Sequence, residues 1–465
     1  MSEKSTTSKN YRSNSVKKIE QEPIIAVGAM TIPAGKVSFT LQGEFVTNNQ
    51  STLSAGQYHV NVTGKSVQLS NGSVFDSEVT LTPAAAASFT VHDVVIGINF
   101  HWERKEDQSF QGALKLKIDG AGNLLVINLV PLEQYVTSVI SSEMSATSNL
   151  ELLKAHSIIS RGWLLAQIKP WRIERQTDLS NGAISTNAQG EKELIRWYAR
   201  EAHTEFDVCA DDHCQRYQGI TKATDPRVFE TIKSTRGNVL TFDETICDAR
   251  FSKCCGGMVE DYAAAWDNTK LDYLTVLYDG EHFPAEYQLP LSDEANARQW
   301  ILGHPSAFCN TQDKEILARI LPGFDQETTD FYRWKVALTQ DEVQSLLQKK
   351  LGVDFGAILK LEPVERAESG RLVKLRIVGE KLTLVVGKEL EIRRAFSPSH
   401  LYSSAFIIEA DDSPIPKHFI LHGAGWGHGV GLCQIGAALM AERGYEYQKI
   451  LMHYYPGATL HLLYD

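Results

Sequence analysis

The sequence predicts an α+β protein with β-rich layers, a helical pair that carries a candidate catalytic residue, and a helical insertion. Three observations indicate this class. Apolar residues alternate with polar ones before about residue 130 and again from Ile358, which is typical of strands. Between these regions, apolar residues at helical spacing begin at Pro131. Further helical patterns lie between residues 291 and 350.

Composition places the chain among globular proteins with a large core. It has 465 residues, 43% hydrophobic and 22% charged residues, and a net charge of −11. The acidic balance and the lack of a basic stripe argue against a general nucleic-acid binder. No apolar run is long enough to span a bilayer. The first 20 residues contain no apolar core of an export signal.

The N-terminal half divides into three expected segments. Residues 1–20 are rich in Ser, Lys, Asn and Thr and are expected to form a disordered tail. Residues 21–130 are expected to form a β-rich segment, as the alternation at Val37, Phe39 and Leu41 illustrates. Residues 131–290 are expected to hold the catalytic and metal-binding region, in which 171–200 read as a loop with a short helix.

The first predicted helix carries an irregularity at Glu143. Apolar positions run along one face of residues 132–144, and Glu143 falls on the same stripe. Burial disfavours the charged form of a carboxyl group and raises its pKa, as a general acid near neutral pH requires. An end of the helix at Glu143, with the side chain turned to water, explains the pattern equally well.

A second predicted helix covers residues 149–168. Ser148 and Glu151 have the spacing of a capping box at its start. Lys154 and Arg161 share one face and could present positive charge towards Glu143. A solvated basic stripe is the simpler interpretation of the same two residues.

Cysteines and histidines indicate a metal site. His203, Cys209 and Cys214 lie within twelve positions, and Cys255 is a candidate fourth ligand. Cys254, His213 and a water molecule are alternatives for that position. A Cys209–Cys214 disulfide or buried free thiols would also account for the pattern.

The C-terminal part combines a helical insertion at 291–350 with a β segment at 351–465. Within the latter, glycines occupy every second position from Gly423 to Gly431, between an apolar strand and a helical pattern. The spacing matches neither a dinucleotide fingerprint nor a phosphate loop. The loop is therefore either a tight packing element or one wall of a substrate groove. Its candidate contacts are His422, Trp426, His428 and Gln434.

These motifs together resemble the stage II sporulation protein D family, which includes the amidase-enhancer proteins. The resemblance covers about residue 25 to the C-terminus, with the blocks in family order. They are Val130 to Val136 and Ser142-Glu143-Met144, Leu153 to His156 with Arg161, Gln215-x-Tyr217-x-Gly219, Thr235 to Leu240, Cys255-Gly256-Gly257, Ser369-Gly370-Arg371, 422–437 and His453 to Gly457. His156 and Ser157 depart from the usual pattern, which has glutamine and alanine there.

The resemblance implies a lytic transglycosylase that cuts peptidoglycan glycan strands and leaves 1,6-anhydro-muramoyl ends. Glu143 would be the general acid and base, and Tyr217 joins Lys154, Arg161 and the loop residues as a candidate substrate contact. The alternative is a non-enzymatic enhancer that binds glycan and stimulates a partner amidase. The family also implies a location in the cell envelope or periplasm, although no export signal is visible.

The resemblance further implies zinc. Some members bind it through a histidine and two cysteines spaced much like His203, Cys209 and Cys214, with the second gap one residue shorter here. A structural role is expected, because thiolate-rich sites usually hold the fold together.

Overall fold

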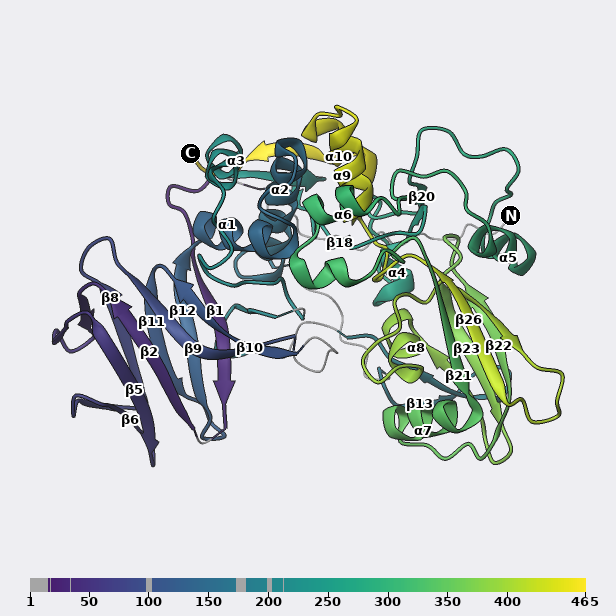
Figure 1. Cartoon of the computed structure of the whole chain (residues 1–465), viewed down its shortest axis with the longest axis horizontal. Helices are drawn as coiled ribbons and strands as arrows, with labels where there is room; N and C mark the ends of the chain where they lie inside the picture. Colours follow the sequence, from purple (N-terminus) through teal and green to yellow (C-terminus); the bar gives the residue numbers. More distant parts are fainter. Residues whose placement is uncertain are drawn as a thin grey trace, which may run out of the picture.

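The structure is a computed structural model. It consists of a β sandwich, a central group of helices and a C-terminal pair of sheets, arranged side by side (Figure 1). The structure describes residues 16, 18–33, 35–97, 103–172, 181–198, 203–211 and 213–465. The predicted α+β class is confirmed. Most of the predicted tail, and residues 173–180 and 199–200 of the predicted loop, lie outside the described residues.

The N-terminal sandwich contains two antiparallel sheets, one of which gains a short parallel strand from the metal-binding region. The seven-stranded sheet has the order β15 (Val208–Cys209), β1 (Ile24–Ile32), β12 (Leu124–Pro131), β11 (Ala113–Ile118), β8 (Glu78–Pro83), β3 (Phe45–Thr47) and β4 (Thr52–Leu53). The six-stranded sheet has the order β10 (Arg104–Phe110), β9 (Ser88–Ile96), β2 (Lys36–Gln42), β5 (Gly56–Thr63), β6 (Ser66–Leu69) and β7 (Val74–Asp76). Val37, Phe39 and Leu41 point into the core, as their alternation predicted.

The central helices pack α1 (Leu132–Glu143) against α2 (Leu150–Gln167) and α3 (Pro226–Thr235). The C-terminal helices α9 (Gln434–Glu442) and α10 (Tyr447–Tyr454) return to cover α2. The predicted capping box at Ser148 is wrong. Asn149 caps α2 instead by accepting the backbone N–H of Glu151, and Ser148 is buried one residue earlier.

The C-terminal part has two sheets. The five-stranded sheet has the order β13 (Ile184–Thr186), β14 (Lys192–Ile195), β24 (Thr383–Gly387), β23 (Leu372–Gly379) and β22 (Ile358–Arg366). The three-stranded sheet has the order β21 (Arg333–Thr339), β26 (His418–Ala424) and β25 (Phe406–Ala410). The helices α7 (Gln340–Leu351) and α8 (Glu389–Ala395) accompany these sheets.

Short elements connect these parts. They are β16 (Asn238–Phe242), β17 (Thr245–Ile246), β28 (Thr459–Leu462), β18 (Phe251–Ser252), β27 (Leu432–Cys433), β19 (Met258–Val259), β20 (Leu277–Tyr278), α4 (Tyr262–Ala265), α5 (Glu294–Leu302), α6 (Lys314–Ile320) and the 3₁₀ helix η1 (Gly323–Glu327). The helices predicted within 291–350 are confirmed as α5, α6 and α7. Sheets nevertheless cross the expected segment boundaries, because β14 pairs with β24 and β21 pairs with β26.

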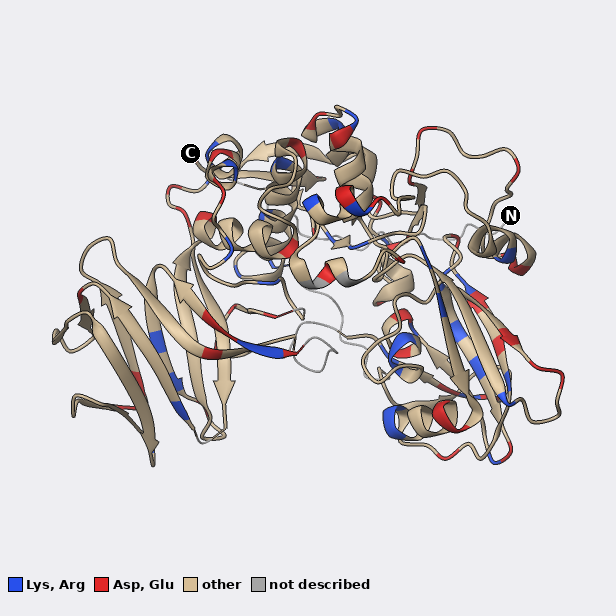
Figure 2. Ribbon diagram, viewed as in Figure 1, with Lys and Arg blue, Asp and Glu red and all other residues tan. Residues whose placement is uncertain are grey.

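Acidic and basic residues are intermixed in the described part of the chain. Figure 2 shows acidic and basic residues mixed over the helices and the C-terminal sheets. Within the described part of the chain, no helix has the length and apolar character needed to cross a membrane.

Candidate active site and metal centre

Glu143 is the last residue of α1, and its side chain is buried. The helix ends because Met144 adopts an extended conformation with φ −125° and ψ 166°. The carboxyl group does not turn to water, since the residue is 9% exposed. Its Oε1 accepts the backbone N–H of Arg216 at 3.0 Å. The helix therefore ends at Glu143, as the interpretation with a solvent-exposed side chain expected. The side chain is nevertheless buried, as the interpretation as a general acid expected.

Two cations and a second carboxylate surround the end of α1. Lys253 Nζ donates to the backbone carbonyl of Glu143 at 3.2 Å and pairs with Asp325 Oδ2 at 2.7 Å. Arg216 Nη1 lies 3.5 Å from the same carboxylate oxygen. Burial acts to raise the pKa of Asp325, but Lys253 and Arg216 outweigh it and hold that pKa below its ordinary value. Asp325 is thus an ionised partner of both cations.

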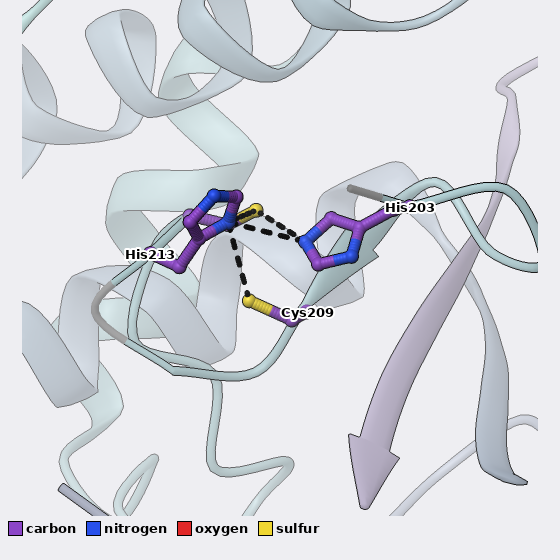
Figure 3. A group of neighbouring side chains, drawn as sticks. His203, Cys209 and His213 are labelled. Carbon is purple, nitrogen blue, oxygen red and sulfur yellow. Dashed lines mark hydrogen bonds between the residues drawn. The ribbon is translucent and has the colours of Figure 1, made fainter. Parts of the chain in front are cut away.

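Four metal-ligating side chains meet next to this segment: His203, Cys209, His213 and Cys214 (Figure 3). Their ligand atoms all lie within 4.8 Å of one another. His203 Nε2 is 3.2 Å from His213 Nδ1 and 3.4 Å from Cys214 Sγ. His213 Nδ1 lies 3.5 Å from Cys214 Sγ and 3.9 Å from Cys209 Sγ.

These separations fit a tetrahedral zinc site. Zinc binds thiolates at about 2.3 Å and imidazoles at about 2.0–2.1 Å, so the edges of its tetrahedron measure roughly 3.3–3.8 Å. The measured donor separations fall within or close to that range. His213 would take the fourth position, which the sequence left open among several candidates. Cys255 does not belong to this group and lies in a separate buried cluster with Asp279, Cys309 and Cys433.

The metal-ligand group is joined to Glu143 by a short stretch of backbone. Cys214 is followed by Gln215, which accepts a hydrogen bond from the Tyr135 hydroxyl of α1 at 3.0 Å. Arg216 then donates its N–H to Glu143. Gln218 N–H donates to Ser138 Oγ at 3.0 Å, again on α1. Residues 214–218 therefore run along α1, with the metal ligands at one end and the Glu143 contact in the middle.

The glycine loop follows a strand and precedes a helix, as predicted, but its glycines serve packing. Gly425, Gly427, Gly429 and Gly431 all have positive φ values between 73° and 96°. A Cβ on Gly431 would lie 1.9 Å from the carbonyl oxygen of Arg250, and one on Gly429 would lie 2.2 Å from the Arg371 guanidinium. The space that a side chain would occupy is filled by the protein's own atoms.

Two polar residues of the loop contact other parts of the protein. Gln434 is buried, and its amide lies 3.0 Å from His156 Nε2 on α2. Burial and the nearby Lys253 lower the pKa of His156 to about 3, so its imidazole is neutral. His428 Nδ1 accepts the N–H of Val430 at 3.0 Å. Burial and Arg250 hold the pKa of His428 well below its ordinary value, which matches an acceptor role. Gln434 thus links the start of α9 to α2 inside the protein.

Trp426 and His422, like His428, are partly exposed. Trp426 packs against Tyr402 and Phe331, with ring centroids 4.1 and 4.8 Å away. His422 Nε2 lies 3.0 Å from Glu409 Oε2. The loop reaches the Glu143 region through the segment that contains Lys253, because Cys254 bridges to Trp426.

Arg161 and Tyr217, expected to contact substrate, are buried, and Lys154 is paired within its own helix. Arg161 has no exposed surface and forms a bidentate ion pair with Glu133, at 3.0 and 2.7 Å. Tyr217 is 2% exposed and stacks on Tyr135 at 5.2 Å. Lys154 pairs with Glu151 at 2.7 Å. Arg161 is therefore held inside the fold by Glu133, and Tyr217 packs in the core beside Tyr135.

The sequence interpretation missed Arg216, Lys253 and Asp325. Arg216 acts through its backbone, which no side-chain pattern can reveal. Lys253 stands beside the cysteine pair that drew attention to metal binding. Asp325 gives no sequence signal, because its partners are brought together only by the fold. A cavity of about 790 Å³ borders His203, Cys209 and Tyr217, but Glu143 is not among its lining residues.

Comparison with known proteins shows a family to which part of the chain is similar. The stage II sporulation protein description matches residues 120–242, which include α1, α2 and the metal-ligand group. Over these residues the chain is similar to stage II sporulation proteins, as two of the relatives below also illustrate. A second description, a domain of unknown function (DUF8618), matches residues 260–431 and includes the helical insertion.

Three relatives illustrate the similarity. The chain is 24% identical over 240 residues to an amidase enhancer of Bacillus subtilis, a match that covers 50% of this chain and 32% of that protein. It is 21% identical over 331 residues to the stage II sporulation protein D of Bacillus amyloliquefaciens, covering 71% of this chain and 74% of that protein. The corresponding Bacillus subtilis protein is 21% identical over 335 residues, with the same coverage. The match thus spans about a third of the amidase enhancer's length.

Proposed function

We propose that this protein is a member of the stage II sporulation protein D family and a lytic transglycosylase that acts on peptidoglycan glycan strands in the cell envelope. The observation that carries the proposal is the buried Glu143 carboxyl group, oriented by the backbone N–H of Arg216. A carboxyl group fixed in this way has a single orientation relative to a bound substrate. Positioned proton transfer of this kind contributes about 10²–10⁴-fold to an enzymatic rate.

The proposed reaction needs one carboxyl group. Protonated Glu143 donates its proton to the glycosidic oxygen, and the bond from that oxygen to the muramoyl C1 breaks. The resulting Glu143 carboxylate accepts the proton of the C6 hydroxyl of the same sugar. The C6 oxygen then bonds to C1 and closes the 1,6-anhydro ring. No water is consumed, in contrast to glycosidases that use a pair of carboxylates.

Asp325 is available as a second carboxylate, but its environment supports a different role. Its negative charge is compensated by Lys253 and Arg216, at 2.7 and 3.5 Å. These two residues also supply the contacts to Glu143, through a side chain and a backbone N–H respectively. We assign Asp325 the task of positioning Lys253 and Arg216.

A zinc ion held by His203, Cys209, His213 and Cys214 would have a structural role. All four positions of a tetrahedron are then taken by protein ligands, which is typical of structural rather than catalytic zinc. The ion would fix Cys214, two residues before Arg216. It would thereby stabilise the backbone that orients Glu143.

A second candidate function follows from the similarity to an amidase enhancer. In this alternative the chain binds glycan and stimulates a partner amidase without cutting the strand itself. The residues around Glu143 would then line a binding surface, and loss of its acidity would be tolerated.

Digestion of purified glycan strands distinguishes the two functions. We expect the wild-type protein to release fragments with anhydro ends, and Glu143→Gln to lower the rate by about 10²–10⁴-fold. Glutamine keeps an oxygen that accepts the Arg216 N–H, so the variant should unfold at the wild-type temperature. Glu151→Gln, at a partly exposed acidic position of α2, is a matched control that should cut normally. Absence of products from the wild type, with stimulation of an added amidase, would favour the enhancer.

A further inference from the structure

A second cluster of metal-ligating groups lies in the core, apart from the first. Cys255, Asp279, Cys309 and Cys433 offer ligand atoms that all fall within 4.8 Å of one another. All four residues are buried, with at most 2% exposure. Cys255 follows β18, and Asp279 follows β20. Cys309 lies after α5, and Cys433 is the N-cap residue of α9.

The separations between these ligand atoms approach those of a coordination tetrahedron. Cys255 Sγ is 3.5 Å from Cys309 Sγ and 3.2 Å from Asp279 Oδ2. Zinc with thiolate ligands at about 2.3 Å and a carboxylate oxygen at about 2.0–2.2 Å gives edges of roughly 3.4–3.8 Å. Small shifts of the side chains towards a shared ion are enough to complete the geometry.

Neighbouring groups orient the four side chains. The Tyr454 hydroxyl donates to Asp279 Oδ1 at 2.7 Å, which leaves Oδ2 facing the cysteines. The backbone N–H groups of Cys255 and Gly436 point at Cys433 Sγ, at 3.2 and 3.4 Å. Hydrogen bonds of this kind orient ligands and stabilise them in metal sites.

The absence of a side chain at Gly436 permits this arrangement. A Cβ there would lie 2.7 Å from Asp279 Oδ2 and 2.4 Å from the Tyr454 hydroxyl. The first turn of α9 can therefore approach the carboxylate directly. This accounts for one glycine of the C-terminal motif by the needs of the cluster.

The buried carboxylate of Asp279 has little positive charge beside it. A buried carboxylate is costly unless it is paired or binds a metal. Among the described residues, no lysine or arginine forms an ion pair with Asp279, and the basic side chain beside it is His453, with Nε2 at 3.6 Å from Oδ1. A divalent cation beside Oδ2 would supply the missing charge.

We propose that Cys255, Cys309, Cys433 and Asp279 bind a second, structural zinc ion. The ion would hold the N-terminus of α9 against the 251–259 and 279–309 segments. Its environment is closed, because all four positions are filled by buried protein ligands. This proposal does not depend on the activity proposed for Glu143 or on zinc at the first group.

A Cys255–Cys309 disulfide is the competing use of two of these residues. It would leave Cys433 and the Asp279 carboxylate buried without the charge that a metal provides. The sulfur separation of 3.5 Å is well beyond the bond length of about 2.05 Å. A disulfide is therefore an outcome that would overturn the proposal.

The test is the zinc content of the full-length protein, purified from zinc-supplemented cells and measured by plasma mass spectrometry. We expect Cys309→Ala to contain one zinc ion fewer per chain than the wild type. Cys214→Ala should lose the other ion, and Cys309→Ala with Cys214→Ala should lose both. Cys247→Ala is the matched control, because Cys247 is buried and belongs to neither cluster. Unchanged zinc in Cys309→Ala would overturn the proposal.

X-ray absorption at the zinc edge on the wild type keeps the test independent of how the variants fold. Two sites, one with two sulfurs and one with three, give an average of two and a half sulfurs per zinc. An average of two, with one zinc per chain, contradicts the proposal. The proposal is also contradicted if the intact protein is lighter than the reduced chain by two hydrogens and a Cys255–Cys309 cross-linked peptide is found. If instead one zinc is present and only Cys309→Ala removes it, the buried site stands and the zinc at the first group fails.

Discussion

The two ends of α1 carry buried glutamates with different surroundings. Glu133, in the first turn, is 5% exposed, and Glu143, at the last position, is 9% exposed. Glu133 is neutralised by a bidentate ion pair with Arg161 and also accepts the N–H of Gly237 at 3.1 Å. Glu143 accepts a backbone N–H, and the nearby Lys253 contacts its carbonyl while pairing with Asp325.

The contrast shows that burial alone does not identify a functional carboxyl group. Arg161 outweighs the effect of burial and lowers the pKa of Glu133, so this carboxylate stays charged and fixed. A group held in this way stabilises the fold but is poorly suited to exchange a proton. The partners of each carboxylate, rather than its exposure, distinguish structural from chemical roles.

The largest effect on stability is expected at the structural end of α1. Glu133→Gln leaves the Arg161 guanidinium buried without a countercharge, which should lower the free energy of unfolding by about 3–5 kcal/mol. Denaturant unfolding measures this change. Glu143→Gln should change stability by less than about 1 kcal/mol, because the Arg216 contact is retained. A reversed order of the two variants would contradict the comparison.

The ion pair of Glu133 with Arg161 predicts that stability depends on pH. The folded-state pKa of Glu133 is lowered, so its contribution to stability is complete above the unfolded pKa of about 4.3 and is lost as the pH falls below it. Wild type should therefore lose more stability than Glu133→Gln below about pH 4. Parallel stability curves for the two proteins in this range would show that the ion pair is not the cause.

An intermediate effect is expected from the metal ligands beside Glu143. Cys214→Ser should release zinc and loosen the backbone around Arg216, which would reduce glycan cutting by about 10–100-fold, the usual range for residues that support a site indirectly. Zinc content and initial rates should fall together. Cys247→Ser, outside both clusters, should leave both unchanged. Full activity in a zinc-free Cys214→Ser protein would separate the first metal group from the active site.

The smallest effect on the reaction is expected at Asp325. If Asp325 only positions Lys253 and Arg216, Asp325→Asn should lower the rate by less than about 10-fold, because asparagine still accepts hydrogen bonds. Initial rates on glycan strands provide the measurement. A loss comparable to that of Glu143→Gln would make Asp325 a second catalytic carboxylate and point to hydrolysis.

Local patterns predicted the elements that depend on neighbouring residues. The apolar stripe gave the helix that ends at Glu143, and periodicity gave α5 and α6 within the insertion. The capping residue of α2 was misplaced by one position, because Ser148 and Asn149 are both good capping residues and packing decides between them. Similarly, His203, Cys209 and Cys214 could be grouped because they are close in sequence.

Contacts between distant segments could not be predicted in the same way. Strand β14 pairs with β24, although the two strands are far apart in the sequence. The alternation of apolar residues predicts a strand but not its partner. Cys255 was assigned to the first metal group, but the fold brings it to Cys309 and Cys433 instead. The sequence left the glycines at 425–431 open as a tight packing element or a groove wall, and only the structure shows that atoms of Arg250, Arg371 and other residues of the same chain lie against them.

The most direct test of the proposed reaction is glycan digestion in water enriched in oxygen-18, followed by mass spectrometry of the new ends. A lytic reaction uses the C6 hydroxyl of the substrate, so we expect anhydro ends that contain no solvent oxygen. Glu143→Gln should form such ends about 10²–10⁴-fold more slowly. One solvent oxygen at each new reducing end would show hydrolysis and contradict the one-carboxyl account.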